Sequence, residues 1–227
     1  MNLANAHFFP LTPVFLVGLA LLLVFLVVLV EVGLLGYAYE KIGVGRRYVF
    51  AVLVLSLVGS YVNIPLVQLP PERVISNQVV SFFGIEYVIP MVRSWPGTLL
   101  TVNLGGAVIP SVLSLYLLIK NKLYLRGLLG VAVVTVVVHF LAQPVRGIGI
   151  AVPTFVPPLV AAGVALLLSR RSAPAVAYIS GSLGTLIGAD LLNLDKIQGL
   201  GAPVASIGGA GTFDGVFLTG ILAALLA

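Results

Sequence analysis

The stretch from Leu11 to Val30 reads LTPVFLVGLALLLVFLVVLV and contains no charged residue. A helix needs about 20 apolar residues to cross a hydrocarbon core about 30 Å thick. The apolar run continues to Tyr37 with Glu31 as its one charge, and no Lys or Arg precedes it. A secretory signal peptide has a basic start and a shorter apolar core. The segment therefore predicts a membrane span.

The composition of the whole chain agrees with that prediction. The 227 residues are 60% hydrophobic and 8% charged, and the mean hydropathy is +1.18. Soluble domains are about 25% charged, so a soluble enzyme is excluded. The chain has no Cys and two His, which excludes disulfides and thiol chemistry and argues against a metal centre. We therefore expect no metal and no cofactor. We also expect no nucleic-acid partner, because a net charge of +5 in such a chain usually reflects membrane topology.

Six further segments are expected to form membrane spans. The predicted fold class is all-α: a single transmembrane domain over residues 1–227, built as a polytopic helix bundle of about seven spans with a Gly-rich, re-entrant or broken last segment. The residues between Pro70 and Pro96 are too polar to cross and are expected to form an outer loop, with a short interfacial helix at most. The six segments are about Tyr48–Val67, Gly97–Ile119, Leu128–Ala142, Ile150–Leu168, Ala173–Leu194 and Ala202–Ala227.

The basic residues predict the orientation of the chain. If every span crosses, eight of the 12 Lys and Arg residues fall on one side and four on the other. Loops rich in Lys and Arg face the cytoplasm. The chain is therefore expected in the cytoplasmic membrane with its N-terminus outside and its C-terminus in the cytoplasm. The eight are Lys41, Arg46, Arg47, Lys120, Lys122, Arg126, Arg170 and Arg171, and the four are Arg73, Arg93, Arg146 and Lys196.

Two carboxylates stand out because they lie within or beside predicted spans. Asp190 and Asp214 are each flanked by apolar and small residues. An ionisable side chain at that depth is costly and is a functional hypothesis by default. Before Asp190, the residues Ser180, Gly184 and Gly188 lie four apart and form one smooth helix face. Such a face favours ordinary helix packing, although Gly188 also remains a candidate substrate-binding residue.

The segment before Asp214 predicts a break in the last helix. Gly208, Gly209 and Gly211 are three glycines in four residues, which make a poor helix. The 13 residues after Asp214 would extend about 20 Å as a helix. We therefore expect a half-helix that starts near Asp214, and irregular backbone before it that lines a wet, buried site. The three glycines are candidate ligand-binding residues.

The two aspartates could meet across one hairpin, because 23 residues separate them. Two close carboxylates cannot both ionise, so such a pair holds one proton and can act as a general acid and base on water. His139, Gln143 and Arg146 precede a Pro/Gly-rich stretch and could line the same outer vestibule.

Two resemblances to known families follow from these motifs. The residues Gly181–Gly220, Gly147–Leu159 and Asn103–Pro110 resemble an uncharacterised prokaryotic membrane family, known only as a domain of unknown function. That resemblance extends over most of the chain. It implies a multi-span membrane protein and no particular activity.

A second resemblance covers about 40 residues. Asp190-Leu191-Leu192 and Gly211-Thr212-Phe213-Asp214 resemble the two motifs of the di-aspartyl intramembrane proteases, the presenilin and signal-peptide-peptidase class. The resemblance implies that Asp190 and Asp214 form a catalytic pair, and that Pro157 and Pro158 take the place of a proline motif that contacts substrate.

Three functions remain open from the sequence. An aspartyl-protease-like hydrolase would use the two aspartates on a membrane-embedded peptide. A transporter or channel would bind a small ion, proton or solute at the broken helix between Gly208 and Gly211 with Asp214. A non-catalytic scaffold would use both aspartates only as helix caps. The bilayer is the expected partner in each case, and the sequence does not predict an oligomeric state.

Overall fold

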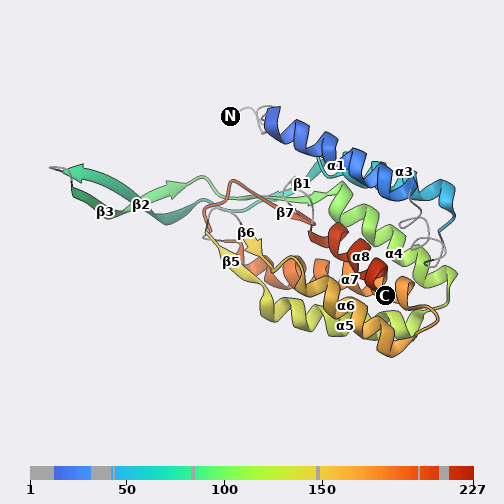
Figure 1. Ribbon diagram of the computed structural model, residues 1–227. Helices are drawn as coiled ribbons and strands as arrows, with labels where there is room; N and C mark the ends of the chain where they lie inside the picture. The colour runs from blue at the N-terminus through green and yellow to red at the C-terminus, as the bar shows by residue number, and fades with distance from the viewer. Residues whose placement is uncertain are drawn as a thin grey trace.

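The computed structural model describes residues 13–31, 42, 44–82, 85–146, 149–198, 200–209 and 215–227. Helices make up most of this part of the chain, and two long strands project from one end of the helical body (Figure 1). The helices are α1 (Pro13–Glu31), α3 (Arg46–Gly59), α4 (Ile109–Lys120), α5 (Tyr124–Leu141), α6 (Val156–Leu168), α7 (Ala173–Thr185) and α8 (Gly215–Leu226).

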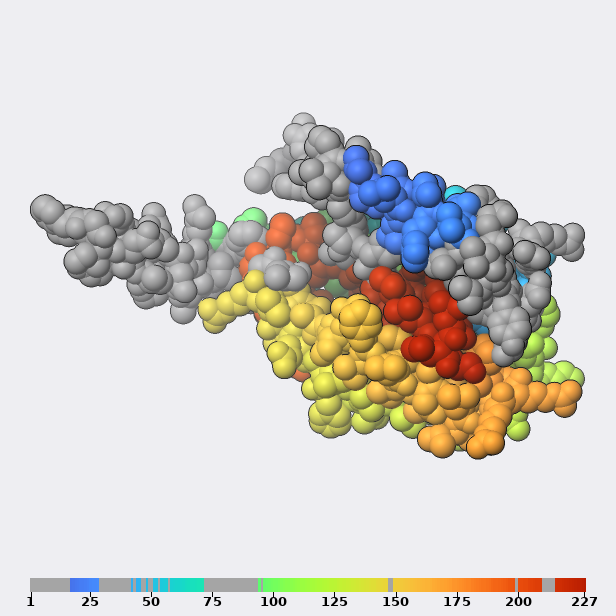
Figure 2. Space-filling view, in the orientation of Figure 1, coloured from blue at the N-terminus to red at the C-terminus, as the bar shows by residue number. Residues whose placement is uncertain are grey.

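Helix α7 is the centre of the body. Apart from Leu183, all of its residues are buried. It packs against α4, α5, α6 and α8, so that its small side chains lie between four neighbours. Figure 2 shows α8 (red) at the surface beside α6 (orange). The polar groups of a helix that is buried on all sides need hydrogen-bond partners or cavities inside the protein. The same requirement applies to Asp190, which follows α7 in the chain.

Helix α7 does not end at Thr185 but changes its winding. The π-helical turn η3 (Leu186–Asp190) and the 3-10 segment η4 (Leu191–Lys196) continue it. A second π-helical turn, η2 (Leu104–Val108), begins the helix that continues as α4. π-helical turns inside helices are frequent at functional sites.

Strands correct the expectation of an all-α fold. A three-stranded sheet has the order β1-β4-β7, formed by Asn63–Gln68, Leu99–Asn103 and Val204–Ile207. Strand β1 pairs antiparallel and β7 parallel with the central β4. The parallel pairing places β7 beside β4, which directly precedes η2, and Leu99 lies opposite Val204.

The polar segment between Pro70 and Pro96 is a hairpin and not a loop with an interfacial helix. Strands β2 (Glu72–Phe82) and β3 (Ile85–Trp95) pair antiparallel along their whole length. Both strands are rich in β-branched and aromatic residues, which favour this extended pairing. A shorter hairpin, β5 (Gln143–Val145) with β6 (Gly149–Ala151), follows α5.

The predicted spans are matched unevenly by the helices. In the described residues, two helices are long and apolar enough to cross a membrane, Tyr124–Leu141 and Ala173–Lys196. The apolar helices Leu104–Lys120, Val156–Leu168 and Gly215–Leu226 are shorter, because strands β4, β6 and β7 take up parts of the segments predicted to span. The prediction of about seven spans is therefore not confirmed, whereas a mostly helical fold with two candidate spans is.

Candidate functional site

A cavity of about 340 Å³ lies where η3, α6, α8, β7 and the β5–β6 hairpin meet. Asp190 is the one ionisable side chain among the described residues that line it. The other polar lining side chains are hydroxyls, on Thr154, Thr185, Ser206 and Thr219. The described lining is thus largely apolar, with one ionisable residue and four residues that carry hydroxyls.

The Asp190 carboxylate joins two distant segments of the chain. Its Oδ2 accepts a hydrogen bond from the backbone N–H of Gly208, with a donor–acceptor distance of 2.7 Å. A backbone amide offers only a partial positive charge, and no Lys, Arg or His is among the described lining residues. An ionised Asp190 therefore has no full counter-charge among the described lining residues, which is costly inside a low-dielectric body.

Gly208 can make this contact because it has no side chain. Its φ is +83°, a conformation that L side chains rarely adopt. A Cβ at this position would also lie 2.5 Å from the backbone nitrogen of Ala107 in η2. Gly209 follows with a φ of +106°, so the chain turns sharply after β7. The glycines therefore serve close backbone approach and bring an N–H to the carboxylate.

Asn193 holds the unwound end of α7 in place. Its side chain is fully buried, and its Nδ2 donates to the carbonyl oxygens of Gly188 and Ala189, each at 2.9 Å. Its Oδ1 accepts a hydrogen bond of 2.7 Å from Lys196 Nζ. These bonds satisfy carbonyl groups that a regular helix would pair with backbone N–H groups further along. Asn193 thereby fixes the turn from which Asp190 projects.

A second polar network fixes the opposite wall. Asn103 is buried, its Nδ2 donates to Ser60 O at 2.6 Å and to Asn63 Oδ1 at 3.0 Å, and its Oδ1 accepts from Gly106 N at 2.8 Å. Ser206 Oγ donates to the same Asn63 Oδ1 at 2.8 Å. The network ties β1, β4 and β7 to η2, and so determines where Gly208 lies.

The structure brings together some of the residues that the sequence singles out. Asp190, Pro157 and Gly209 all line the cavity, and Gly208 contacts Asp190 through its N–H. Pro158 is buried in α6 but is not among the described lining residues.

Other candidates lie elsewhere. Gly188 faces α5, where a Cβ would lie 2.6 Å from the carbonyl oxygen of Thr135, so it serves helix packing. His139 Nδ1 lies 3.4 Å from Asn193 Nδ2 and is not a described lining residue. Gln143 and Arg146 are exposed on and beside β5 and do not line the cavity either.

Asp214 and Gly211 lie outside the described residues. The helix α8 begins at Gly215, next to the predicted start at Asp214, and Gly209 and Gly215 on either side both line the cavity. The pairing of Asp190 with Asp214 therefore stays a prediction.

The sequence reasoning missed Asn193, Thr185 and Thr219. Asn193 stands three residues after Asp190 and carried a usable signal, because an amide at that spacing shares a helix face with the carboxylate. Thr185 and Thr219 had no comparable signal, since a threonine in an apolar helix usually bonds to its own backbone.

The comparison with family models settles the family. The model for DUF1614, described as a protein of unknown function, matches residues 57–226. The chain belongs to the DUF1614 family. The matched DUF1614 region includes every residue of the cavity and leaves out α1 and most of α3. No curated protein and no solved structure matches the chain. Membership of DUF1614 agrees with the first resemblance and lends no support to the protease resemblance.

We predict that Asn193→Ala destabilises the DUF1614 region, because it leaves the carbonyls of Gly188 and Ala189 without their side-chain donor. The free energy of unfolding should fall by about 1–3 kcal/mol. Thermal unfolding of the purified protein measures this, with Gln198→Ala, an exposed amide nearby, as the matched control. Equal stability of the two variants would show that Asn193 does not hold the unwound turn.

Proposed function

We propose that this DUF1614 protein is a polytopic integral membrane protein that binds a small cation at Asp190 and carries it across the bilayer. The observation that carries the proposal is one carboxylate, without a basic partner among the described lining residues, in an otherwise uncharged cavity.

The surface of the helical body supports residence in a bilayer. Phe140 in α5 is 81% exposed, Leu125 in the same helix 72%, and Leu167 in α6 88%. Water-soluble proteins rarely expose apolar residues so fully over neighbouring helices, whereas lipid solvates them at no cost. The two candidate spans, α5 and Ala173–Lys196, belong to this body.

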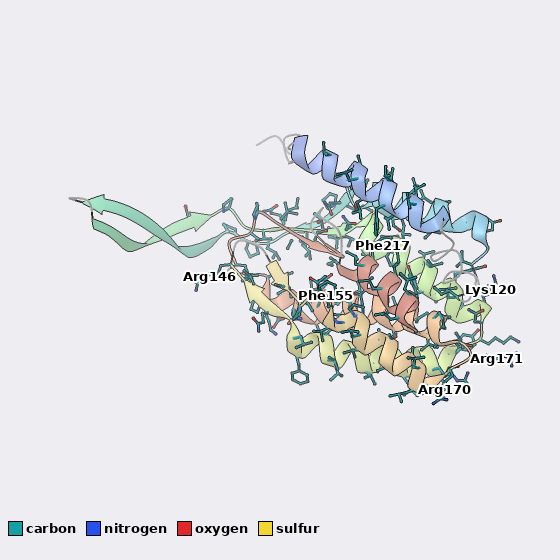
Figure 3. The ribbon with its side chains drawn as sticks, in the orientation of Figure 1. Lys120, Arg146, Phe155, Arg170, Arg171 and Phe217 are labelled. Atoms are coloured by element: carbon teal, nitrogen blue, oxygen red, sulfur yellow. The ribbon has the colours of Figure 1, made fainter. Side chains whose placement is uncertain are left out.

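The distribution of basic residues supports an orientation. Lys120, Arg170 and Arg171 lie at one end of the body and Arg146 at the other (Figure 3). By the preference of Lys and Arg for cytoplasmic loops, the end with Lys120 faces the cytoplasm. The cavity, which the β5–β6 hairpin helps to line, would then lie toward the outer face.

The backbone around the cavity supports a binding site for a charged solute. The stretch that continues α7 is π-helical up to Asp190 and 3-10 beyond it, and α8 is a half-length helix that follows the positive-φ glycines Gly208 and Gly209. Interrupted helices that meet inside the membrane are typical of transporter sites for ions and solutes. A scaffold role explains the hydrogen bond to Gly208, but it does not explain why a partly exposed carboxylate lines a cavity.

A cation also accounts for the electrostatics. A carboxylate inside a low-dielectric body stays ionised only beside a positive charge, and otherwise it takes up a proton. The single N–H of Gly208 supplies neither. A hydrolase would instead use this carboxylate with Asp214, which lies outside the described residues.

Cysteine labelling tests the orientation. The chain has no Cys, so each introduced Cys is the only thiol. We expect Gln143→Cys, an exposed position beside the cavity end, to react with a membrane-impermeant maleimide in intact cells. Arg170→Cys, exposed at the other end, should react only after the membrane is permeabilised. The reverse pattern, or labelling of both in intact cells, would contradict the proposed topology.

Uptake into proteoliposomes tests the function. We expect Asp190→Asn, which keeps the shape and removes the charge, to lower uptake of small cations by about tenfold or more, since the site then loses its counter-charge. Asp195→Asn is the matched control, because Asp195 is exposed five residues further along.

Two outcomes would contradict the proposal. Uptake by a folded Asp190→Asn variant equal to that of Asp195→Asn would show that the carboxylate does not bind the transported ion. Cleavage of a membrane peptide that is lost in both Asp190→Asn and Asp214→Asn would replace transport with hydrolysis.

A further inference from the structure

The cavity beside Asp190 is larger than a bare ion requires. Its volume is about 340 Å³, within the range of about 300–1,000 Å³ that is typical of small-molecule sites. A water molecule takes up about 30 Å³ in the liquid, and a bare metal ion takes up less. The volume therefore leaves room for a charged group and for an organic substituent attached to it.

The walls of the cavity suit an apolar substituent. They bring together apolar side chains from η4, β7, α8 and the residues after β6. Ile207 and Val216 belong to one buried hydrophobic cluster, and Leu194 packs against it. Val152 packs against the larger core cluster. These walls are held by the packing of the protein itself, and transfer of an apolar group from water to such walls is favourable.

The described lining offers few ligands to a metal ion. A metal ion that sheds its water needs several oxygen ligands around it. Asp190 is the one ionisable side chain among the described lining residues. Of the four residues with hydroxyls, Thr185 has an Oγ1 that is enclosed by protein, and Ser206 Oγ donates to Asn63 Oδ1 at 2.8 Å. One carboxylate with so few free hydroxyls is a poor substitute for a hydration shell.

An ammonium group needs less from the protein. Its N–H groups donate to a carboxylate in short, charge-assisted hydrogen bonds, and an alkylamine carries its extra proton at neutral pH as the Lys side chain does. Asp190 Oδ2 accepts from Gly208 N, and Oδ1 accepts no hydrogen bond from the other described residues. Within the described structure, Oδ1 is not among the enclosed oxygens that lack a partner, so it is open to the cavity that Asp190 lines.

We propose that the cation bound at Asp190 is a small organic amine in its ammonium form, with its N–H groups at Oδ1 and its alkyl group against the apolar walls. The inference rests on the proposed cation site and names the chemical class of its preferred ligand. A metal ion of the same charge is also attracted to the carboxylate, but it gains nothing from the apolar walls and binds more weakly.

Thermal unfolding with a series of alkylammonium chlorides tests the inference without any transport. A ligand that binds only the folded state raises its stability by an amount set by the ligand concentration relative to the Kd. At constant ionic strength, kept with NaCl, we expect methyl-, ethyl-, propyl- and butylammonium to raise the melting temperature of the purified full chain at progressively lower concentrations. Each methylene buried should lower the half-saturating concentration about fourfold. Asp190→Asn should lose the response to the whole series.

Gly215 allows the apolar part of the site to be tested with the charge intact. It lines the cavity, and a Cβ added there would have no described atom within 4 Å. Gly215→Leu should therefore fill part of the cavity and raise the half-saturating concentration of butylammonium about tenfold, because the alkyl group loses its space, while that of methylammonium changes little.

Gly163→Leu in α6 is the matched control. A Cβ at Gly163 would also have no described atom within 4 Å, and Gly163 is not among the described lining residues. This variant should titrate with both methyl- and butylammonium as the wild type does.

The outcomes separate this inference from the proposed function. Equal half-saturating concentrations for methyl- and butylammonium, or a Gly215→Leu variant that titrates like Gly163→Leu, overturn the organic ligand. If uptake of metal cations depends on Asp190, and butylammonium neither inhibits that uptake nor stabilises the protein, the proposed function stands and the inference fails. If butylammonium stabilises the wild type and not Asp190→Asn, but uptake does not depend on Asp190, the binding site stands and transport fails.

Discussion

The hydrogen bond from the Gly208 N–H to Asp190 Oδ2 is the contact on which the site depends. It joins the end of the central helical stretch to the turn after β7, although the two groups are 18 residues apart. The bond is short, at 2.7 Å, but it gives the carboxylate only a dipole and not a counter-charge. A carboxylate that is held in place, with no basic side chain among the described lining residues, is suited to bind and release a mobile cation.

The geometry of that contact is set from both sides by polar groups inside an apolar body. On one side, Asn193 donates to the carbonyl oxygens of Gly188 and Ala189, so these two groups keep a hydrogen-bond donor where the helix unwinds. On the other side, the Asn103, Asn63 and Ser206 network fixes the sheet from which the glycine turn departs. Unwound backbone inside a membrane requires such internal partners, because lipid offers none.

The sequence predicted the parts of this arrangement that depend on composition and local spacing. The apolar runs predicted a mostly helical body, the glycines before Asp214 predicted a break, and α8 begins at Gly215. The position of Asp190 within a predicted span made it a functional candidate, and Asp190 lines the cavity. The strands were missed because short apolar runs such as Leu99–Asn103 suit a helix or a strand equally, and only the long-range parallel pairing with Val204–Ile207 decides between them.

The central claim is the proposal that Asp190 binds a small cation in the cavity. Anomalous diffraction from crystals grown with Tl⁺, a monovalent cation that scatters X-rays strongly, tests it most directly. The account predicts an anomalous peak in the cavity within about 3 Å of an Asp190 carboxylate oxygen, a distance suited to direct ligation by oxygen. A cavity with ordered water but no Tl⁺ peak, or a basic side chain ion-paired with Asp190, would contradict it.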